Sequence, residues 1–322
     1  MEQITLGRSG LRVSRIAFGT WQLGGDWGRT DEDAAIAAIR RAADQGVTLF
    51  DTAQAYGFGA SERLLATALD GRSREGLVIA TKGGLRSVGG GVVRDASPRA
   101  VRTGVELSLQ ALRTEAIDLY QMHWPDPATP IEETAETVAA LVGEGKILHV
   151  GVSNFDVKEM DAFSTVLPVE TLQPPYHLFR RDIGAEILPY AATNHIGVLV
   201  YGPLAHGLLG GHLTPASTFG ADDWRRTSSV FQGESFRRNL NAVSELQVFA
   251  REEFGTSVSR LAVAWTLANP AVQVAIVGTR NAAHVDDALA AAELHLDGEA
   301  LARIDAIMAS AEPVSGPSPE TV

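Results

Sequence analysis

The chain contains no cysteine among its 322 residues. Disulfide bonds, thiolate nucleophiles and cysteine metal sites are therefore all excluded. It also lacks an apolar run long enough to span a membrane. Residues 1–5 do not have the basic-then-apolar order of a secretory signal. These absences predict a cytoplasmic protein with no membrane partner.

Positive charge is scarce as well. Lysine and arginine number 27 against 39 aspartate and glutamate residues, for a net charge of -12. The basic residues occur in short pairs such as Arg180-Arg181 and Arg237-Arg238, not in clusters. Because nucleic-acid phosphates are bound by clustered lysine and arginine, the composition disfavours a nucleic-acid partner. A hydrophobic content of 45% is ordinary for a globular chain and does not favour disorder.

What is present is an alternation of two kinds of segment. Short strand-like runs occur near 15–18, 47–51, 77–82, 117–122, 147–151, 170–173, 198–201 and 274–277. Helix-like segments occur near 31–45, 61–69, from 97 onwards, and near 131–143, 156–166, 183–194, 240–268 and 281–291. This order predicts an α/β fold, a (β/α)8 TIM barrel that forms one domain over residues 1–322.

Other segments refine this prediction. A Gly-containing turn between two short runs predicts an N-terminal β-hairpin before the barrel. Residues 207–236 form the longest connection without a clear strand and are a candidate lid, and residues 311–322 are predicted to be an irregular tail. A doubly wound sheet is the alternative fold. It is disfavoured because residues 19–25 do not have the spacing of a Gly-rich dinucleotide turn.

Four ionisable residues lie at or just after consecutive predicted strands. Asp51, Lys82 and His123 end the second, third and fourth strands, and Tyr56 lies in the loop after the second. Taken singly, such residues are more often caps, solvated groups or structural histidines. In a parallel barrel, however, the carboxyl ends of the strands meet at one mouth, where active sites form. Their joint placement therefore predicts a catalytic site.

The chemistry that suits this set is proton donation by a phenol. Tyrosine has a reference pKa of about 10, so it needs a nearby cation that stabilises its phenolate. Lys82 can supply that cation, and Asp51 can keep Lys82 charged and oriented. His123 can hydrogen-bond the same oxygen that Tyr56 protonates. The set has no electron donor, so carbonyl reduction would require hydride from a cofactor.

Motifs in the same order resemble a known family over nearly the full length of the chain. They are Gly19-Thr20-Trp21, Phe50-Asp51-Thr52-Ala53-x-x-Tyr56-Gly57, Ala80-Thr81-Lys82, Asp118-Leu119-Tyr120-x-x-His123, Gly151-Val152-Ser153-Asn154-Phe155 and Ile276-Val277-Gly278-Thr279-Arg280. The chain resembles the aldo-keto reductase superfamily. Residues 123–127 and 173–176 are most similar to its bacterial branch of general stress reductases.

The resemblance implies a barrel that binds a nicotinamide cofactor without a Rossmann domain. Tyr56 would be the general acid, Asp51 and Lys82 its tuning pair, and His123 the group that orients the carbonyl. The implied cofactor-binding residues are Thr20, Ser153, Asn154, Gln173, Tyr201, Gly202, Leu204, Gly207, Gly278, Thr279, Arg280 and Asp287. Among them, residues 153, 154 and 173 would bind the carboxamide and Tyr201 would stack on the nicotinamide ring.

Cofactor choice is predicted from Arg280, because a guanidinium suits the 2′-phosphate of NADP. NADPH is therefore expected, with NAD less favoured. Three departures from the family pattern leave this preference open: His206 and His212 stand where relatives often carry Arg and Lys, and Ala288 replaces an Asn. Trp21 and Trp124 are expected to wall the substrate pocket. The aromatic residues of 207–236, namely Trp224, Phe231 and Phe236, fit a lid and plain packing equally well.

The sequence thus predicts an NADPH-dependent reductase of aldehydes or ketones, whose partner is a small-molecule carbonyl compound. Its alternative is a cofactor-binding regulatory subunit with little turnover. A metal-dependent barrel hydrolase ranks far lower, because among possible ligands His123 alone is suitably placed beside Asp51; no metal is expected. The pattern does not specify the physiological substrate, the reaction direction, the stereochemistry or the oligomeric state.

Overall fold

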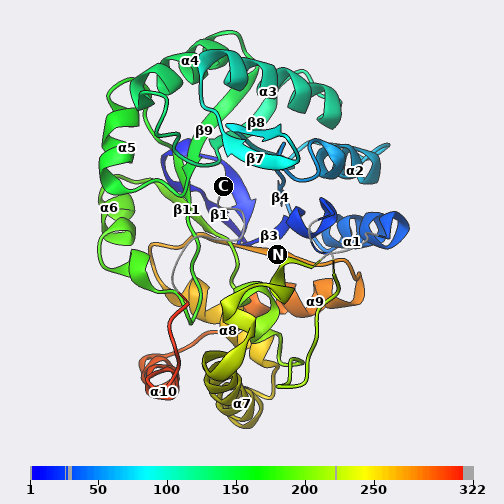
Figure 1. Cartoon of the computed structure of the whole chain (residues 1–322), viewed down its shortest axis with the longest axis vertical. Helices are drawn as coiled ribbons and strands as arrows, with labels where there is room; N and C mark the ends of the chain where they lie inside the picture. Colours follow the sequence, from blue (N-terminus) through cyan, green and yellow to red (C-terminus); the bar gives the residue numbers. More distant parts are fainter. Residues whose placement is uncertain (1, 26, 28–30, 222, 315–322) are drawn as a thin grey trace.

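The computed structural model describes residues 2–25, 27, 31–221 and 223–314, and its strands close into a parallel barrel (Figure 1). Its strands follow one another around the ring in chain order, and the last pairs with the first. They are β3 (Ile16–Gly19), β4 (Leu49–Asp51), β5 (Val78–Gly83), β8 (Ile117–Met122), β9 (Ile147–Ser153), β10 (Thr171–Gln173), β11 (Gly197–Val200) and β12 (Val274–Gly278). The predicted (β/α)8 barrel is confirmed.

Helices surround this ring of strands (Figure 1). They are α1 (Glu32–Asp44), α2 (Ala60–Ala68), α3 (Pro98–Leu112), α4 (Ile131–Gly143), α5 (Val157–Ser164), α6 (Ile187–Thr193), α8 (Val258–Ala268) and α9 (Ala283–Ala290). Several begin at a side chain that accepts a hydrogen bond from the first turn, as Asp31, Ser97 and Asp156 do. These caps satisfy backbone N–H groups that the helix leaves unpaired, so they define where these three helices start.

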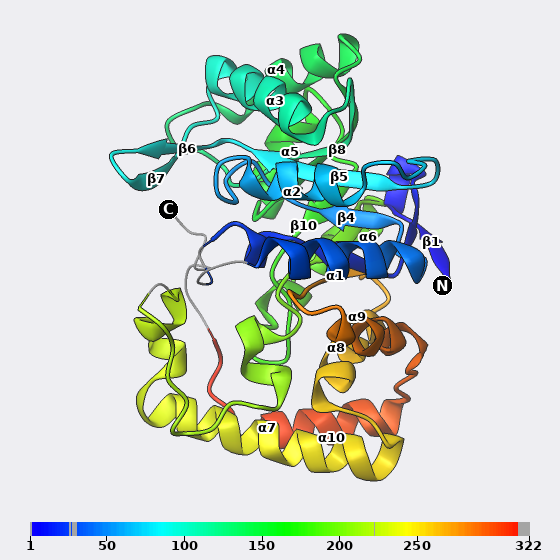
Figure 2. The same ribbon diagram turned by 90° about the vertical axis from the view of Figure 1, so that its right-hand side faces the viewer.

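The N-terminal hairpin consists of β1 (Gln3–Thr5) and β2 (Arg12–Ser14), with a 3-10 turn between them. It closes one end of the barrel: Leu6 and Val13 are fully buried in the same cluster as barrel residues such as Leu49 and Leu199. The predicted hairpin is therefore confirmed. A second hairpin lies at the opposite end of the barrel (Figure 2).

That second hairpin, β6 (Leu85–Val88) and β7 (Gly91–Arg94), lies between the predicted strand at 77–82 and the predicted helix from 97, where the sequence predicts no strand. The predicted helix near 240–268 is also wrong as a single element. It is two helices, α7 (Gly233–Phe254) and α8, separated at Gly255, whose φ of 60° is left-handed. A further helix, α10 (Gly298–Met308), was not predicted and lies beside α7 (Figures 1 and 2).

The predicted lid and tail take irregular paths. In the described part of residues 207–236, short 3-10 turns at Trp224–Arg226 and Ser229–Phe231 stand in place of strands, and α7 begins at Gly233. Residues 311–314 are irregular, and the Val314 N–H donates to the Phe179 carbonyl at 2.7 Å. The rest of the predicted tail, 315–322, lies outside the described residues. No helix in the described part of the chain is long and apolar enough to cross a membrane.

Candidate active site

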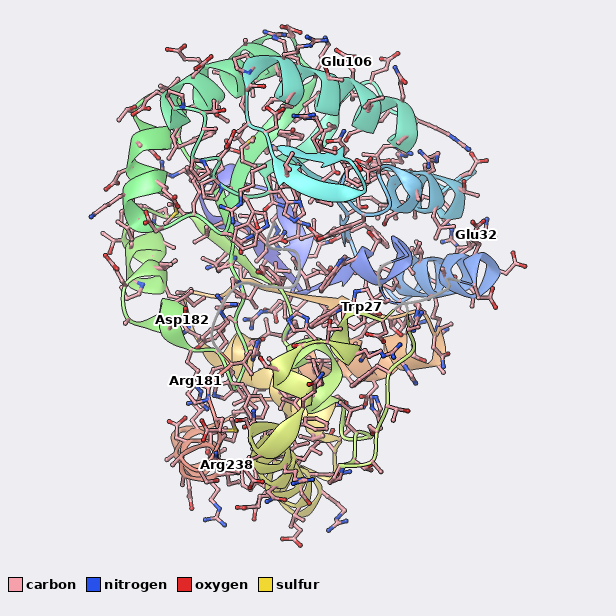
Figure 3. The ribbon with its side chains drawn as sticks, viewed as in Figure 1. Trp27, Glu32, Glu106, Arg181, Asp182 and Arg238 are labelled. Atoms are coloured by element: carbon pink, nitrogen blue, oxygen red, sulfur yellow. The ribbon has the colours of Figure 1, made fainter. Side chains whose placement is uncertain are left out.

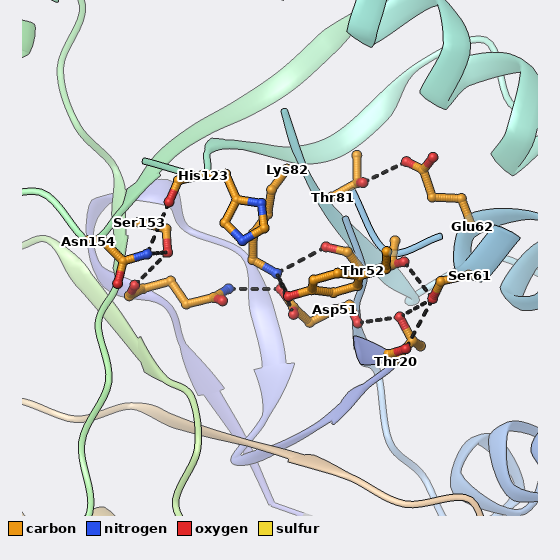
Figure 4. Close-up of polar contacts among 12 residues, drawn as sticks. Thr20, Asp51, Thr52, Ser61, Glu62, Thr81, Lys82, His123, Ser153 and Asn154 are labelled. Carbon is orange, nitrogen blue, oxygen red and sulfur yellow. Dashed lines mark hydrogen bonds and ion pairs between the residues drawn. The ribbon is translucent and has the colours of Figure 1, made fainter. Parts of the chain in front are cut away.

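The predicted strand-end residues converge at one end of the barrel (Figure 4). Asp51 ends β4, Lys82 lies in β5, and His123 follows β8 directly. The Lys82 ammonium donates to the Asp51 carboxylate at 2.7 Å and to the Tyr56 phenol oxygen at 3.2 Å. The rings of Tyr56 and His123 meet edge to face, with centroids 5.8 Å apart. All four predicted catalytic residues are thus in one cluster.

Lys82 is held by three acceptors, which matches the three hydrogens of an ammonium group. The third acceptor is the Thr52 carbonyl, at 3.0 Å. Its partner Asp51 accepts a second hydrogen bond from the Gln173 amide at 2.8 Å. The side chains of Lys82 and Asp51 are 1% and 4% exposed. A pair this deeply buried is stable when hydrogen bonds satisfy both partners, which is the case here.

A cleft of about 490 Å³ opens beside this cluster. Asp51 and Tyr56 lie in its wall. Of the other residues predicted to contact cofactor or substrate, the cleft is lined by Trp21, Gln173, Tyr201, Gly202, Leu204, Gly207, Gly278, Thr279 and Arg280. Its lining also includes His206, His212, Trp27 and Arg225. The cleft therefore connects the predicted catalytic cluster with most of the predicted cofactor residues.

Two predicted cofactor residues stand just behind the lining and support it. The Ser153 hydroxyl donates to the Gln173 carbonyl at 2.8 Å. The Asn154 amide donates to the His123 carbonyl at 3.0 Å and accepts from the Tyr201 phenol at 2.9 Å. Asn154 has a left-handed φ of 61°, a conformation that asparagine tolerates better than most residues. These contacts join His123, Gln173 and Tyr201 into one framework.

Three other predicted residues point elsewhere. The Thr20 hydroxyl donates to the Asp51 carbonyl at 3.0 Å, inside the protein and away from the lining. Asp287 accepts from Arg260 at 2.8 Å on the outer side of α9 and does not line the cleft. Trp124 lies under the Arg94 guanidinium, 4.8 Å from it, and also does not line the cleft.

An aromatic cluster at the cleft combines Trp21, His206 and Trp224, which the sequence already indicated, with Trp27 and His177, which it did not. The Trp21 ring lies 4.9 Å from Trp27, 5.7 Å from His206 and 6.3 Å from Trp224. His177 packs against His206, and its burial, together with His206 and Arg180, lowers the pKa of His177 well below its usual value. Trp224 therefore belongs to the mouth. The other two aromatic residues considered for a lid, Phe231 and Phe236, are buried against each other.

Trp27 lies in the interior of the molecule, whereas Glu32 and Glu106 lie on its outer rim (Figure 3). Trp27 stands in a stretch of sequence that has neither helical nor strand periodicity. His177 lies in a loop after β10. The one available signal was their residue type close to a strand end. That signal is weak without knowledge of how the loops fold.

The cleft fits a dinucleotide cofactor. Its wall is rich in glycine, and Gly202 and Gly207 have left-handed φ values of 66° and 96°. A Cβ on Gly278 would lie 2.9 Å from the Gly19 carbonyl oxygen, so bare backbone lines the cleft there. Arg280 adds a cation to the lining, as a phosphate-bearing ligand requires. No group of three His, Asp or Glu side chains within the described ranges could hold a metal ion.

Comparison with known proteins agrees with this geometry. Residues 15–309 match the model of the Aldo/keto reductase family. The chain is 45% identical over 282 residues to Aldo-keto reductase YhdN of Bacillus subtilis (strain 168), covering 87% of this chain and 85% of that protein. It is 33% identical over 283 residues to the NADH-specific methylglyoxal reductase of Escherichia coli (strain K12), covering 83% and 86%.

Solved structures give the same result. The glycerol dehydrogenase AKR11B4 from Gluconobacter oxydans superposes with a TM-score of 0.87 at 40% identity, covering 97% of this chain and 96% of that one. The family model, the sequence relatives and the solved structure therefore all match over most of this chain. The mouth of its barrel holds the tyrosine, lysine, aspartate and histidine that the motifs predict. The protein belongs to the aldo/keto reductase family and is an NAD(P)H-dependent oxidoreductase.

Proposed function

We propose that this protein reduces the carbonyl group of an aldehyde or ketone to an alcohol with NADPH, and that Tyr56 is the general acid. The observation that carries the proposal is the position of the Lys82 ammonium. It lies between the Asp51 carboxylate at 2.7 Å and the Tyr56 oxygen at 3.2 Å, and both of these residues line a cleft of cofactor size. A buried cation beside a phenol favours the phenolate, which makes the phenol a better proton donor.

In this reaction the bound nicotinamide supplies the hydride. Tyr56 holds the proton that the carbonyl oxygen receives, and the Lys82 ammonium stabilises the phenolate that remains. Asp51 acts through Lys82 by holding the ammonium in place. His123, edge to face against Tyr56, orients the carbonyl oxygen toward the phenol. Because each of these steps can run backwards, the same residues serve alcohol oxidation.

The framework behind the cleft would hold the cofactor. Ser153, Asn154 and Gln173 would bind its carboxamide, and Tyr201 would face the nicotinamide ring. Tyr201 lines the cleft and its phenol is anchored to Asn154, so the ring has a fixed orientation. The glycine-containing backbone from 202 to 211 lets the pyrophosphate approach closely.

NADPH is favoured over NADH by Arg280. Its guanidinium lines the cleft three residues before α9, where it can pair with a 2′-phosphate. The E. coli relative is named as NADH-specific, so family membership does not decide cofactor choice. Arg280 is therefore the residue on which this part of the proposal depends.

Replacement of Tyr56 by Phe tests the catalytic role. The variant loses the proton donor but keeps the ring, so turnover should fall at least about 10²-fold while NADPH affinity stays near the wild-type value. The measurements are steady-state NADPH oxidation over a panel of aldehydes, ketosugars and cyclic ketones, and a fluorescence titration with NADPH. NADH is run in parallel.

Tyr176→Phe is the matched control. Tyr176 is 6% exposed and Tyr56 is 5% exposed, but Tyr176 stacks on Trp265 and does not line the cleft. This control should keep full turnover. Retained turnover in Tyr56→Phe would refute the assigned role. A wild-type protein that binds NADPH tightly yet oxidises it with no carbonyl in the panel would favour a regulatory subunit instead.

A further inference from the structure

Two fully buried polar residues stand behind the catalytic cluster without a part in the proposed chemistry. Ser61 and Glu62 lie in the first turn of α2 and are both 0% exposed. Most helices expose polar residues in their first turn, where such residues act as caps. Here the N-cap is Gly59, and it makes no side-chain hydrogen bond. Ser61 and Glu62 must therefore be judged by what they contact inside the protein.

Ser61 is the middle of a chain of three hydroxyl groups (Figure 4). The Thr52 hydroxyl donates to the Ser61 oxygen at 3.1 Å, and the Ser61 hydroxyl donates to the Thr20 hydroxyl oxygen at 2.7 Å. The Thr20 hydroxyl donates in turn to the backbone carbonyl of Asp51 at 3.0 Å. This series of hydrogen bonds starts on Thr52 and ends on Asp51, the two residues of one dipeptide. Three elements thus close a ring of hydrogen bonds around a single peptide unit.

That peptide unit is the one that holds Lys82. The Asp51 carboxylate and the Thr52 carbonyl supply two of the three acceptors of the ammonium, at 2.7 Å and 3.0 Å. Any shift of this dipeptide changes the 3.2 Å separation between the Lys82 nitrogen and the Tyr56 oxygen. In a buried site, the stabilisation of a phenolate by a cation depends steeply on their separation. The ring is therefore placed to control the acidity of Tyr56.

Glu62 makes the corresponding contact on the next strand. Its carboxyl oxygen accepts from the Thr81 hydroxyl at 2.7 Å, and Thr81 directly precedes Lys82 in β5. Burial raises the pKa of Glu62 above its usual value, which the hydrogen bond from Thr81 partly opposes. Consecutive residues of one helical turn thus fasten the two strands that carry Asp51 and Lys82.

We propose that Ser61 is a positioning residue for the reaction: through Thr52 and Thr20 it fixes the Asp51-Thr52 peptide, and thereby the distance from Lys82 to Tyr56. Glu62 supports the same geometry from β5. The inference rests on the proposed role of Tyr56 as the acid. It adds a residue that touches neither substrate nor cofactor and acts through Thr52 and Thr20.

The test compares Ser61→Ala with Thr52→Val, which removes one hydroxyl of the ring at nearly constant volume. In each variant the ammonium should stabilise the phenolate less. Turnover should fall about tenfold, with NADPH affinity unchanged, since small misplacements of catalytic groups are costly. The alkaline limb of the pH profile for reduction should move to higher pH, because Tyr56 then ionises less readily. The Ser61→Ala/Thr52→Val double variant should lose no more than the single variants.

Ser14→Ala is the matched control. Ser14 is also 0% exposed and hydrogen-bonded, donating to the Ile16 carbonyl at 2.7 Å, but it lies in β2, which pairs with β1 in the N-terminal hairpin. It should lower stability without moving the pH profile. Falling turnover in Ser61→Ala with an unmoved alkaline limb would assign Ser61 a structural role and overturn the proposal.

A second readout does not require turnover. An ultraviolet tyrosinate titration isolates Tyr56 by subtracting the spectrum of the matching Tyr56→Phe protein, made in both the wild-type and the Ser61→Ala background. The Tyr56 midpoint should move to higher pH in Ser61→Ala, and an unchanged midpoint would refute the positioning role. If Tyr56→Phe retained turnover, the proposed function would fail, while this titration would still decide whether Ser61 positions Lys82.

Discussion

Arg280 is held by a partner that a phosphate can replace. Its guanidinium donates to the backbone carbonyl of Trp27 at 3.2 Å, in the lining of the cleft. A carbonyl carries no net charge, so a 2′-phosphate dianion competes well for the same group. Arg280→Ala should therefore weaken NADPH binding at least about tenfold and leave NADH binding nearly unchanged. Dissociation constants from protein-fluorescence quenching with each cofactor measure the difference.

The control for that prediction is Arg41→Ala. Arg41 pairs with Asp286 in an ion pair on the protein surface, so its removal should change neither affinity. Equal losses of NADPH and NADH affinity in Arg280→Ala would show that the residue supports the Trp27 backbone rather than binding the phosphate.

The residues that the sequence could predict are those whose position the strands fix. Asp51, Lys82 and His123 each stand at a strand end, and the barrel brings strand ends together whatever the loops do. Ser61 could not be recognised in the same way. A Ser-Glu pair at the start of a helix is typical of an exposed first turn. Its actual burial follows from how closely α2 packs behind the barrel mouth, which is a tertiary property.

At the scale of elements, the β6–β7 hairpin shows what sequence reasoning overlooked. The run of glycines after β5 is typical of a loop. Its Gly89-Gly90 pair has positive φ values of 59° and 86°, as a two-residue hairpin turn requires, and Val88 pairs directly with Gly91. A glycine pair between alternating residues is a known hairpin signal. The sequence therefore contains the turn signal that sets the register of this hairpin, but the neighbouring glycines obscure it.

The long connection before α7 bears on the lid prediction. Asp223 and Arg225 form a forked ion pair at 2.6 Å, and the Arg225 guanidinium lies 4.8 Å from the Trp27 ring. Asp223 also forms a backbone bridge with Trp27. Burial alone would raise the pKa of Asp223, but the hydrogen bonds from Arg225 lower it below the usual value. The Asp223–Arg225 ion pair is therefore intact at neutral pH and weakens as acid protonates Asp223.

If the Asp223–Arg225 ion pair closes over a bound cofactor, loss of this ion pair should speed cofactor release. Asp223→Ala leaves Arg225 without its carboxylate and loosens the contact with Trp27. The dissociation rate of NADPH should rise several-fold, which stopped-flow displacement by excess NADP measures directly. Asp286→Ala, which removes the exposed pair with Arg41, is the control and should leave the rate unchanged. A wild-type release rate in Asp223→Ala would mean that the segment packs at the mouth without gating it.

At the scale of the whole molecule, the two ends of the barrel have different tasks. The cleft and the catalytic cluster lie at the carboxyl ends of the strands, whereas the N-terminal hairpin closes the other end (Figure 2). One interior cluster joins the ends, since it includes Leu6 from the hairpin and Tyr201 from the cleft. In barrels of this kind, residues at the amino ends of the strands serve stability and those at the carboxyl ends serve catalysis.

Leu6 allows that separation to be measured. It is 0% exposed, and a Cβ on Gly197 would lie 2.8 Å from its Cγ, so the barrel leaves room for this side chain. Leu6→Ala should lower the free energy of unfolding by about 2–5 kcal/mol, because the packed barrel cannot collapse around the cavity. Under native conditions kcat and KM should stay at wild-type values. Urea unfolding and steady-state assays on the same preparation test both parts.

Leu107→Ala provides the reference for a leucine that does not fill the core. Leu107 is 49% exposed on α3, and its replacement should change the free energy of unfolding by less than about 0.5 kcal/mol. If Leu6→Ala were as mild as Leu107→Ala, the hairpin would not close the barrel in solution as tightly as the contact with Gly197 requires. If instead kcat fell together with stability, the interior cluster would transmit strain from Leu6 to Tyr201, and the two ends would not be independent.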